Sequence, residues 1–149
     1  MELSCKTEYA LLAMIELGVH YAQGEPLQIR QIAQQQQIPD RYLEQLLATL
    51  RRAGFVKSQR GAKGGYLLTR EPWNILLLDV VSCIEGYEQT APATPTEKNP
   101  IEKTAEALVV KDLWHQVQSA AQDVLAQHTL QDLIDQRNAR QQVDLMYYI

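Results

Sequence analysis

The feature that most constrains the fold lies in residues 40–69, where an amphipathic helical pattern stops at a glycine and leads directly into a glycine-rich basic hairpin. The segment "DRYLEQLLATLRRA" (40–53) repeats leucine at helical spacing and ends before Gly54, a common helix terminator. Two short β-type runs, 55–59 and 65–69, flank the turn "RGAKG". A shorter helical pattern over 29–36 precedes them. Two helices separated by a short break and followed by a hairpin are the order of a winged helix-turn-helix.

The remaining segments predict a mainly α protein. Apolar spacing indicates helices over 6–23, 75–86 and 103–128, and "TLQD" (129–132) is typical of a capping box that starts a short last helix. Three prolines within 87–102 indicate a flexible loop, and the tail from residue 137 gives no assignment. We therefore expect a winged helix-turn-helix DNA-binding domain over 1–86, a loop over 87–102, and a long dimerisation helix with a C-terminal tail over 103–149.

Charge is unevenly distributed along the chain. The net charge is −4, yet residues 30–70 hold eight Lys or Arg against two acids, Asp40 and Glu44. A local basic stretch attracts polyanions even when the whole molecule is acidic. The acidic C-terminal half would repel DNA and so favour one docking orientation.

The glycine-rich turn does not match the known phosphate-binding loops. A Walker loop needs its lysine and a hydroxyl residue directly after the last glycine, whereas Lys63 precedes Gly64 here, and no helix opens after these glycines as a dinucleotide fingerprint requires. Two interpretations of the turn remain, a solvated hairpin turn and a DNA-contacting wing, and the adjacent helix favours the wing. The candidate wing residues are Arg60, Gly61, Lys63, Gly64 and Gly65.

The outer face of the helix over 40–53 carries side chains of the types that contact phosphates and base edges. The alternative is a merely solvated charged face. Glu44 is acidic on a basic face, so we expect it to set specificity by accepting a hydrogen bond from a cytosine amino group. The candidate DNA-binding residues here are Arg41, Tyr42, Glu44, Gln45, Thr49, Arg51 and Arg52.

The helix over 103–128 has an apolar seam with alternating spacings of four and three, which suits either an intramolecular core helix or a dimer interface. A single small reading domain binds DNA weakly, so a two-fold homodimer on a pseudo-palindrome is expected. The predicted seam residues are Val110, Trp114, Val117, Ala121 and Val124.

Other classes of function find little support in the sequence. The three histidines, His20, His115 and His128, have no paired nucleophile, so no enzyme is predicted. Cys5 and Cys83 lack metal-ligand spacing, so no metal site is predicted. The chain has no apolar run of the roughly 20 residues that span a bilayer, and its N-terminus lacks the pattern of a signal peptide. We expect a cytoplasmic protein without membrane contact.

The segment "YLEQLLATLRRAGFVKSQRGAKGGYLL", together with "YALLAMIELG" and "LWHQV", resembles the IscR/NsrR/CymR family of bacterial winged-helix transcription regulators. The resemblance implies a homodimeric, sequence-specific DNA-binding regulator, most often a repressor, whose helix 40–53 reads the major groove. Tyr42, Glu44 and Gln45 match positions from which family members contact bases, and residues 60–65 match the wing.

Many members of this family sense through an iron–sulfur cluster held by three cysteines in the loop that corresponds to residues 87–107. This sequence has no cysteine there, and Lys111 stands where IscR-like proteins offer a histidine. No cofactor is therefore expected, and the signal is a partner protein, a small molecule or thiol oxidation. Two alternatives stay open. One is a redox or metal-responsive sensor that uses Cys5 or Cys83, including the minor case of a cluster shared across a dimer. The other is a protein-interaction module that does not bind DNA.

Overall fold

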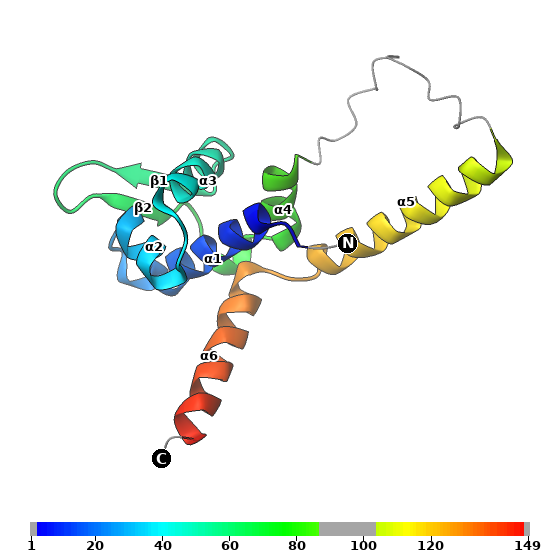
Figure 1. Cartoon of the computed structure of the whole chain (residues 1–149). Helices are drawn as coiled ribbons and strands as arrows, with labels where there is room; N and C mark the ends of the chain where they lie inside the picture. Colours follow the sequence, from blue (N-terminus) through cyan, green and yellow to red (C-terminus); the bar gives the residue numbers. More distant parts are fainter. Residues whose placement is uncertain (1–2, 87–103, 148–149) are drawn as a thin grey trace.

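The computed structural model describes residues 3–86 and 104–147 and is mainly helical, with one small sheet (Figure 1). In chain order its elements are α1 (Cys5–Val19), the 3-10 helix η1 (Tyr21–Gln23), α2 (Ile29–Gln36), α3 (Asp40–Arg52), β1 (Val56–Gln59), β2 (Gly65–Leu68), the 3-10 helix η2 (Pro72–Asn74), α4 (Leu77–Glu85), α5 (Ala105–Ala126) and α6 (Leu130–Tyr147). The predicted class and the order helix, helix, hairpin are confirmed. The predicted loop over 87–102 lies outside the described residues, and the division of the chain into domains stays a prediction.

The core forms around α1, which packs on α2, α3, α4 and α6. The leucine stripe predicted for α3 is its buried face, made by Leu43, Leu46, Leu47 and Leu50. Leu130 and Ile134 at the start of α6 are buried in the same core. Gly18 on α1 permits this contact, because a Cβ there would lie 2.5 Å from Ile134 Cδ1. The beginning of α6 is therefore held by the N-terminal helices.

The last helix is longer than predicted. Its capping box is confirmed, since Thr129 N–H donates to Asp132 Oδ2 at 2.8 Å and Asp132 N–H donates to Thr129 Oγ1 at 3.3 Å. The prediction of a short helix is wrong, because α6 continues through the unassigned tail to Tyr147. Once its first turns are anchored by Leu130 and Ile134, the helix propagates through good helix formers such as Gln, Arg and Ala.

The hairpin is tied to the rest of the molecule by a third extended segment. Strands β1 and β2 pair antiparallel, from Val56 opposite Leu68 to Gln59 opposite Gly65. Leu27, in the connection before α2, bridges to Tyr66: Leu27 N–H donates to Tyr66 O at 3.0 Å, and Tyr66 N–H donates to Leu27 O at 2.7 Å. The wing is thus hydrogen-bonded to the start of the helix-turn-helix.

The first turn of α1 is joined to the last residue of α4 by hydroxyl groups. Ser4 caps α1, and its Oγ donates to Glu85 Oε1 at 2.5 Å, while Thr7 Oγ1 donates to the same oxygen. The hydrogen bonds from Ser4 and Thr7 lower the pKa of Glu85 below its ordinary value of 4.5. The charged carboxylate is therefore favoured in the folded state.

Glu85→Gln is expected to lower the melting temperature at neutral pH. The difference in melting temperature between the variant and the unaltered protein should disappear at acid pH. A carboxyl whose pKa is depressed by folding contributes stability above its unfolded pKa and loses it as the pH falls through the folded pKa. Thermal denaturation between pH 7 and pH 3 measures the difference. A gap that persisted unchanged at the acid end would show that the charge of Glu85 contributes nothing.

Among the described helices, none is both long and apolar enough to cross a membrane.

Candidate nucleic-acid interface

The face of α3 opposite its leucines is polar and accessible. Six of its seven predicted contact residues are exposed: Arg41, Tyr42, Glu44, Gln45, Arg51 and Arg52. Thr49 is half-buried, and its Oγ1 donates to the Gln45 backbone oxygen at 3.0 Å. Arg52 reaches back to Thr49 with Nη2 at 3.4 Å from Oγ1, whereas Arg51 Nη1 lies 3.4 Å from Ser58 Oγ on β1. Arg51 therefore lies toward the sheet, and Arg52 lies toward the middle of the helix.

A surface hollow adds a residue that the sequence did not single out. Lys6, at the start of α1, lines a cavity of about 540 Å³ with Tyr42, Gln45, Thr49 and Arg52 of α3. Tyr42 is held beside it by an edge-to-face contact with Tyr9 of α1, with ring centroids 5.5 Å apart. Nothing in the sequence around Lys6 indicates this position, because it depends on how α1 crosses α3.

The wing tip separates into accessible and inward-facing residues. Arg60, Gly61 and Lys63 are exposed, Gly65 is half-buried and Gly64 is buried. A Cβ on Gly64 would lie 2.3 Å from the Gln59 backbone oxygen, so the turn itself requires glycine there. Of the five predicted wing residues, the two cations and Gly61 are therefore the ones presented to a partner.

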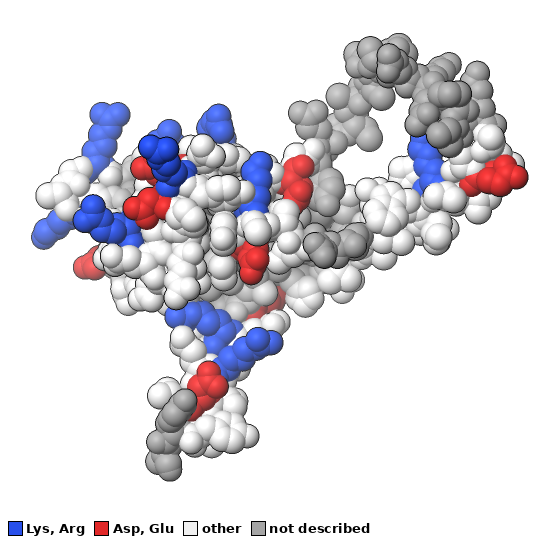
Figure 2. Space-filling model, in the orientation of Figure 1, with Lys and Arg blue, Asp and Glu red and all other residues white. Residues whose placement is uncertain are grey.

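Among the described residues, the cations of this surface have no acidic partner within 4.0 Å. Over residues 3–86 and 104–147, both ion pairs within 4.0 Å involve a histidine, Glu16 with His20 and Asp132 with His128. Figure 2 shows Lys and Arg side chains gathered at the end of the molecule that carries α3 and the wing. This end consequently presents positive charge that is free to meet an anion.

Helix α5 leaves its apolar seam open. Val110, Trp114 and Val124 are 68%, 52% and 56% exposed, and Val117 and Ala121 are half-buried. No residue of α5 is fully buried, and Figure 1 shows the helix extending away from the helices around α1. The apolar surface also includes Leu108, Val109 and Leu113, which the predicted seam did not contain.

The residues present do not suit an iron–sulfur cluster. Cys5 is exposed on α1 and Cys83 is half-buried on α4, and burial raises the pKa of the Cys83 thiol while Arg52 partly offsets this. Within the described ranges, no three His, Cys, Asp or Glu side chains group as metal ligands. The chain has no other cysteine, whereas such clusters are held chiefly by several thiolates.

A family model described as "Rrf2: Iron-dependent Transcriptional regulator" matches residues 3–136. The chain belongs to the Rrf2 family. Rrf2 relatives include the HTH-type transcriptional regulator CymR of Bacillus subtilis, 37% identical over 147 residues and covering 99% of each chain. The HTH-type transcriptional regulator IscR of Xenorhabdus nematophila is 31% identical over 134 residues, which cover 90% of this chain and 79% of that protein.

Solved Rrf2 structures share the fold. "T. potens IscR" has a TM-score of 0.72 at 33% identity and covers 92% of this chain and 88% of its own. "CymR (YrzC) the Global Cysteine Regulator of B. subtilis" has a TM-score of 0.71 at 35% identity, with coverage of 91% and 97%. The resemblance read from the helix and wing is confirmed, and the chain is a DNA-binding transcription regulator of the helix-turn-helix type.

Proposed function

We propose that the protein is a homodimeric repressor that binds a pseudo-palindromic operator in the cytoplasm and performs no catalytic step. The observation that carries this proposal is the meeting of three features at one end of the molecule: the exposed polar face of α3, the cations of the wing tip, and the absence of acidic partners for those cations within the described residues. An α-helix fits the major groove, and a basic hairpin beside it meets the neighbouring phosphates.

Each side chain on this surface has a distinct role in the proposal. Tyr42, Glu44 and Gln45 lie on the first turns of α3, from which they read base edges, while Arg41, Arg60 and Lys63 neutralise phosphates. Lys6 joins the second group, since it borders the same hollow as Gln45 and Arg52. Repression then follows from occupancy, because a bound dimer excludes the transcription machinery from the operator.

The open seam of α5 supports the dimer. Exposed tryptophan and valine side chains along a helix favour burial against a second copy of the same helix, and a two-fold pair of reading heads matches a pseudo-palindrome. Half-sites are then expected about 34–36 Å apart along the DNA, or at multiples of that spacing.

The proposal includes no iron–sulfur cluster, although the family model is described as iron-dependent. Cys5 and Cys83 supply too few thiolates, and the raised pKa of Cys83 keeps that thiol protonated and less reactive. We propose that the signal is a small molecule or a partner protein.

Selection of sheared genomic DNA by the purified protein at near-physiological salt, followed by sequencing, tests the function. Enrichment of a few promoter fragments that share an imperfect palindrome is the expected result. Recovery of DNA without any shared sequence would reduce the site to a general polyanion-binding surface and overturn the proposed specificity.

Arg60→Ala is expected to weaken binding to most DNA sequences alike, because an arginine at the wing tip contacts phosphate rather than base edges. The slope of log K against log salt should become shallower by about one. Fluorescence anisotropy at several salt concentrations measures both effects. Arg140→Ala on α6, far along the chain from the wing, is the matched control and should leave the slope unchanged.

Glu44→Ala is expected to relax base preference rather than to lower affinity. Removing the carboxylate abolishes its hydrogen bond from a cytosine amino group, so discrimination at one base pair of each half-site should fall about tenfold. Selection from a randomised half-site library measures this preference. Glu25→Ala removes the same charge from an exposed position outside α3 and should retain the full preference. An unchanged preferred sequence in Glu44→Ala would show that Glu44 does not set specificity.

A further inference from the structure

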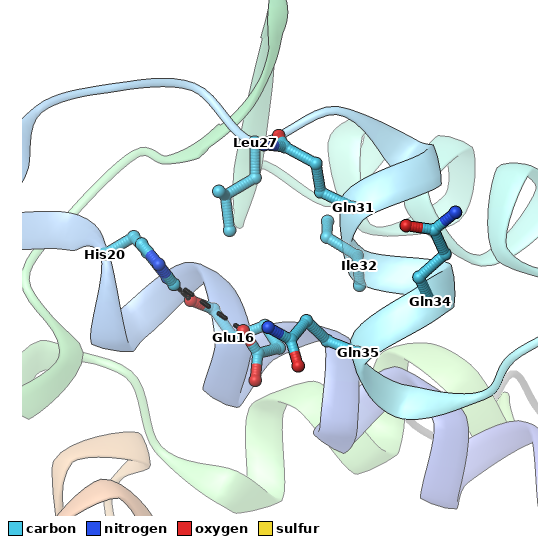
Figure 3. Close-up of a pocket in the computed structure, with 7 residues that line it drawn as sticks. All are labelled: Glu16, His20, Leu27, Gln31, Ile32, Gln34 and Gln35. Atoms are coloured by element: carbon cyan, nitrogen blue, oxygen red, sulfur yellow. Dashed lines mark hydrogen bonds and ion pairs between the residues drawn. The ribbon is translucent and has the colours of Figure 1, made fainter.

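A cavity of about 400 Å³ lies between α1 and α2 and shares no residue with the predicted DNA-contact surface (Figure 3). Its size falls within the range of about 300–1,000 Å³ that small-molecule sites occupy. Figure 3 shows its lining side chains around one hollow: Glu16 and His20 from α1 and its C-cap, Leu27 from the connection, and Gln31, Ile32, Gln34 and Gln35 from α2.

Glu16 is the distinctive group of this cavity, because it is the one ionisable residue among the buried residues of α1, which apart from Thr7 are otherwise apolar. Only 4% of the residue is exposed, and its neighbours Ala13, Met14 and Leu17 belong to the hydrophobic core. Burying a carboxylate is costly unless it is paired and hydrogen-bonded. The partners of its two oxygens therefore determine what the cavity can bind.

The two oxygens of Glu16 differ in their partners. Oε1 accepts a hydrogen bond from Gln36 Nε2 at 2.7 Å. Oε2 lies 4.0 Å from His20 Nδ1, which is beyond hydrogen-bond range, and the same Nδ1 is 2.9 Å from the Glu16 backbone oxygen. Within the described part of the chain, Oε2 accepts no hydrogen bond, and no buried side-chain oxygen there lacks a partner, so Oε2 keeps contact with solvent at the cavity that Glu16 lines.

The walls define the kind of cation that would pair with this oxygen in place of water. Gln34 and Gln35 present carboxamides that can accept N–H groups, and Leu27 and Ile32 offer an apolar strip for a hydrocarbon chain. Among the described lining residues there is one carboxylate, Glu16, and one imidazole, His20, which are too few strong ligands for a divalent metal, so an organic cation suits the site better. The described lining residues include no Lys or Arg, so a ligand that also carries a carboxylate would find no cationic partner among them.

We propose that this cavity binds small aliphatic amines, with the ammonium group paired to Glu16 Oε2 and the methylene chain against Leu27 and Ile32. A bound amine contacts α1 and α2 together, and α2 packs on α3. Its binding therefore stabilises the arrangement of the helix-turn-helix, since a ligand that binds only the folded state adds to its stability.

The test is a titration of the full-length protein, without DNA, with putrescine at constant ionic strength, followed by two-dimensional NMR of backbone amides. Saturable shifts confined to residues 16–20 and 27–36 and a rising melting temperature are expected, and neutral 1,4-butanediol should produce neither effect. Because DNA is absent from this titration, a negative result does not bear on the proposed operator binding. A negative result in the DNA selection likewise does not bear on this site.

Two variants identify Glu16 as the anchor. Glu16→Gln keeps the side-chain shape and should weaken putrescine at least about tenfold, whereas Glu8→Gln, which removes one charge from an exposed position of the same helix, should not. Gln35→Lys, at an exposed lining position, places a tethered ammonium beside Glu16 and should abolish the shifts without a change in folding. Equal binding by the unaltered protein and Glu16→Gln, or no saturable shift at millimolar putrescine, would overturn the proposal.

Discussion

Replacing Trp114 by glutamate is expected to convert the protein into a monomer and to lower its affinity for an operator by about 100-fold or more. Trp114 lies mid-way along the open seam of α5 and is 52% exposed in the single chain. In a dimer it would become the largest buried side chain of the seam, where an unpaired carboxylate is strongly unfavourable. The loss of operator affinity follows because each reading head would then bind its half-site alone.

Sedimentation velocity at micromolar protein measures the oligomeric state, and anisotropy with operator DNA measures the affinity. Ser119→Glu is the matched control, since Ser119 is exposed on the opposite side of α5 from the seam and should tolerate the same charge. A Trp114→Glu protein that remained a dimer at the same concentration would place the interface on another surface of the molecule.

Gly65→Ala is expected to lower the free energy of unfolding by about 3 kcal/mol and the melting temperature by about 6–12 °C. A Cβ at this position would lie 2.3 Å from the Leu27 oxygen and 2.5 Å from the Leu27 carbonyl carbon, both of which are backbone atoms. Relieving the clash requires Leu27 and Tyr66 to separate, which breaks their two hydrogen bonds and releases the wing from the connection before α2.

Thermal and urea denaturation measure this loss. Gly24→Ala provides the comparison, because Gly24 has a φ of +68° but a methyl group added there would have no atom within 4 Å, so only backbone strain of about 1 kcal/mol is expected. Equal losses of unfolding free energy in the two variants would show that the close approach of Gly65 to Leu27 does not govern the effect of Gly65→Ala.

The helix-turn-helix could be predicted from the sequence because its signals are local. The bounds 29–36 coincide with α2, where Gln28 and Gln31 form a reciprocal cap, and the leucines of α3 mark its buried face. The hairpin likewise follows from its glycines and short β-type runs. In each case the residues that determine the element lie within or beside it.

The features that escaped prediction depend on contacts between distant segments. Glu16 reads as one polar residue of an amphipathic helix, and its burial follows only from the packing of α1 against α2 and its bond to Gln36. Lys6 joins the surface of α3 because of how two helices cross. The length of α6 cannot be predicted from its own residues, because its anchors, Leu130 and Ile134, pack on α1, more than 100 residues earlier in the chain.

The bridge between Leu27 and Tyr66 has a consequence for the operator lengths that the proposed dimer would tolerate. The hairpin is hydrogen-bonded through β2 to the segment that enters α2, and β1 packs against α3, so the arrangement of the proposed groove-reading helix and the proposed phosphate-contacting hairpin is fixed within one chain. If a half-site were lengthened by one base pair, the wing alone is not expected to move so as to keep its contacts. For the proposed dimer, tolerance to changes in operator length is therefore expected between the two half-sites, while the spacing inside each half-site is expected to follow from the arrangement of one chain.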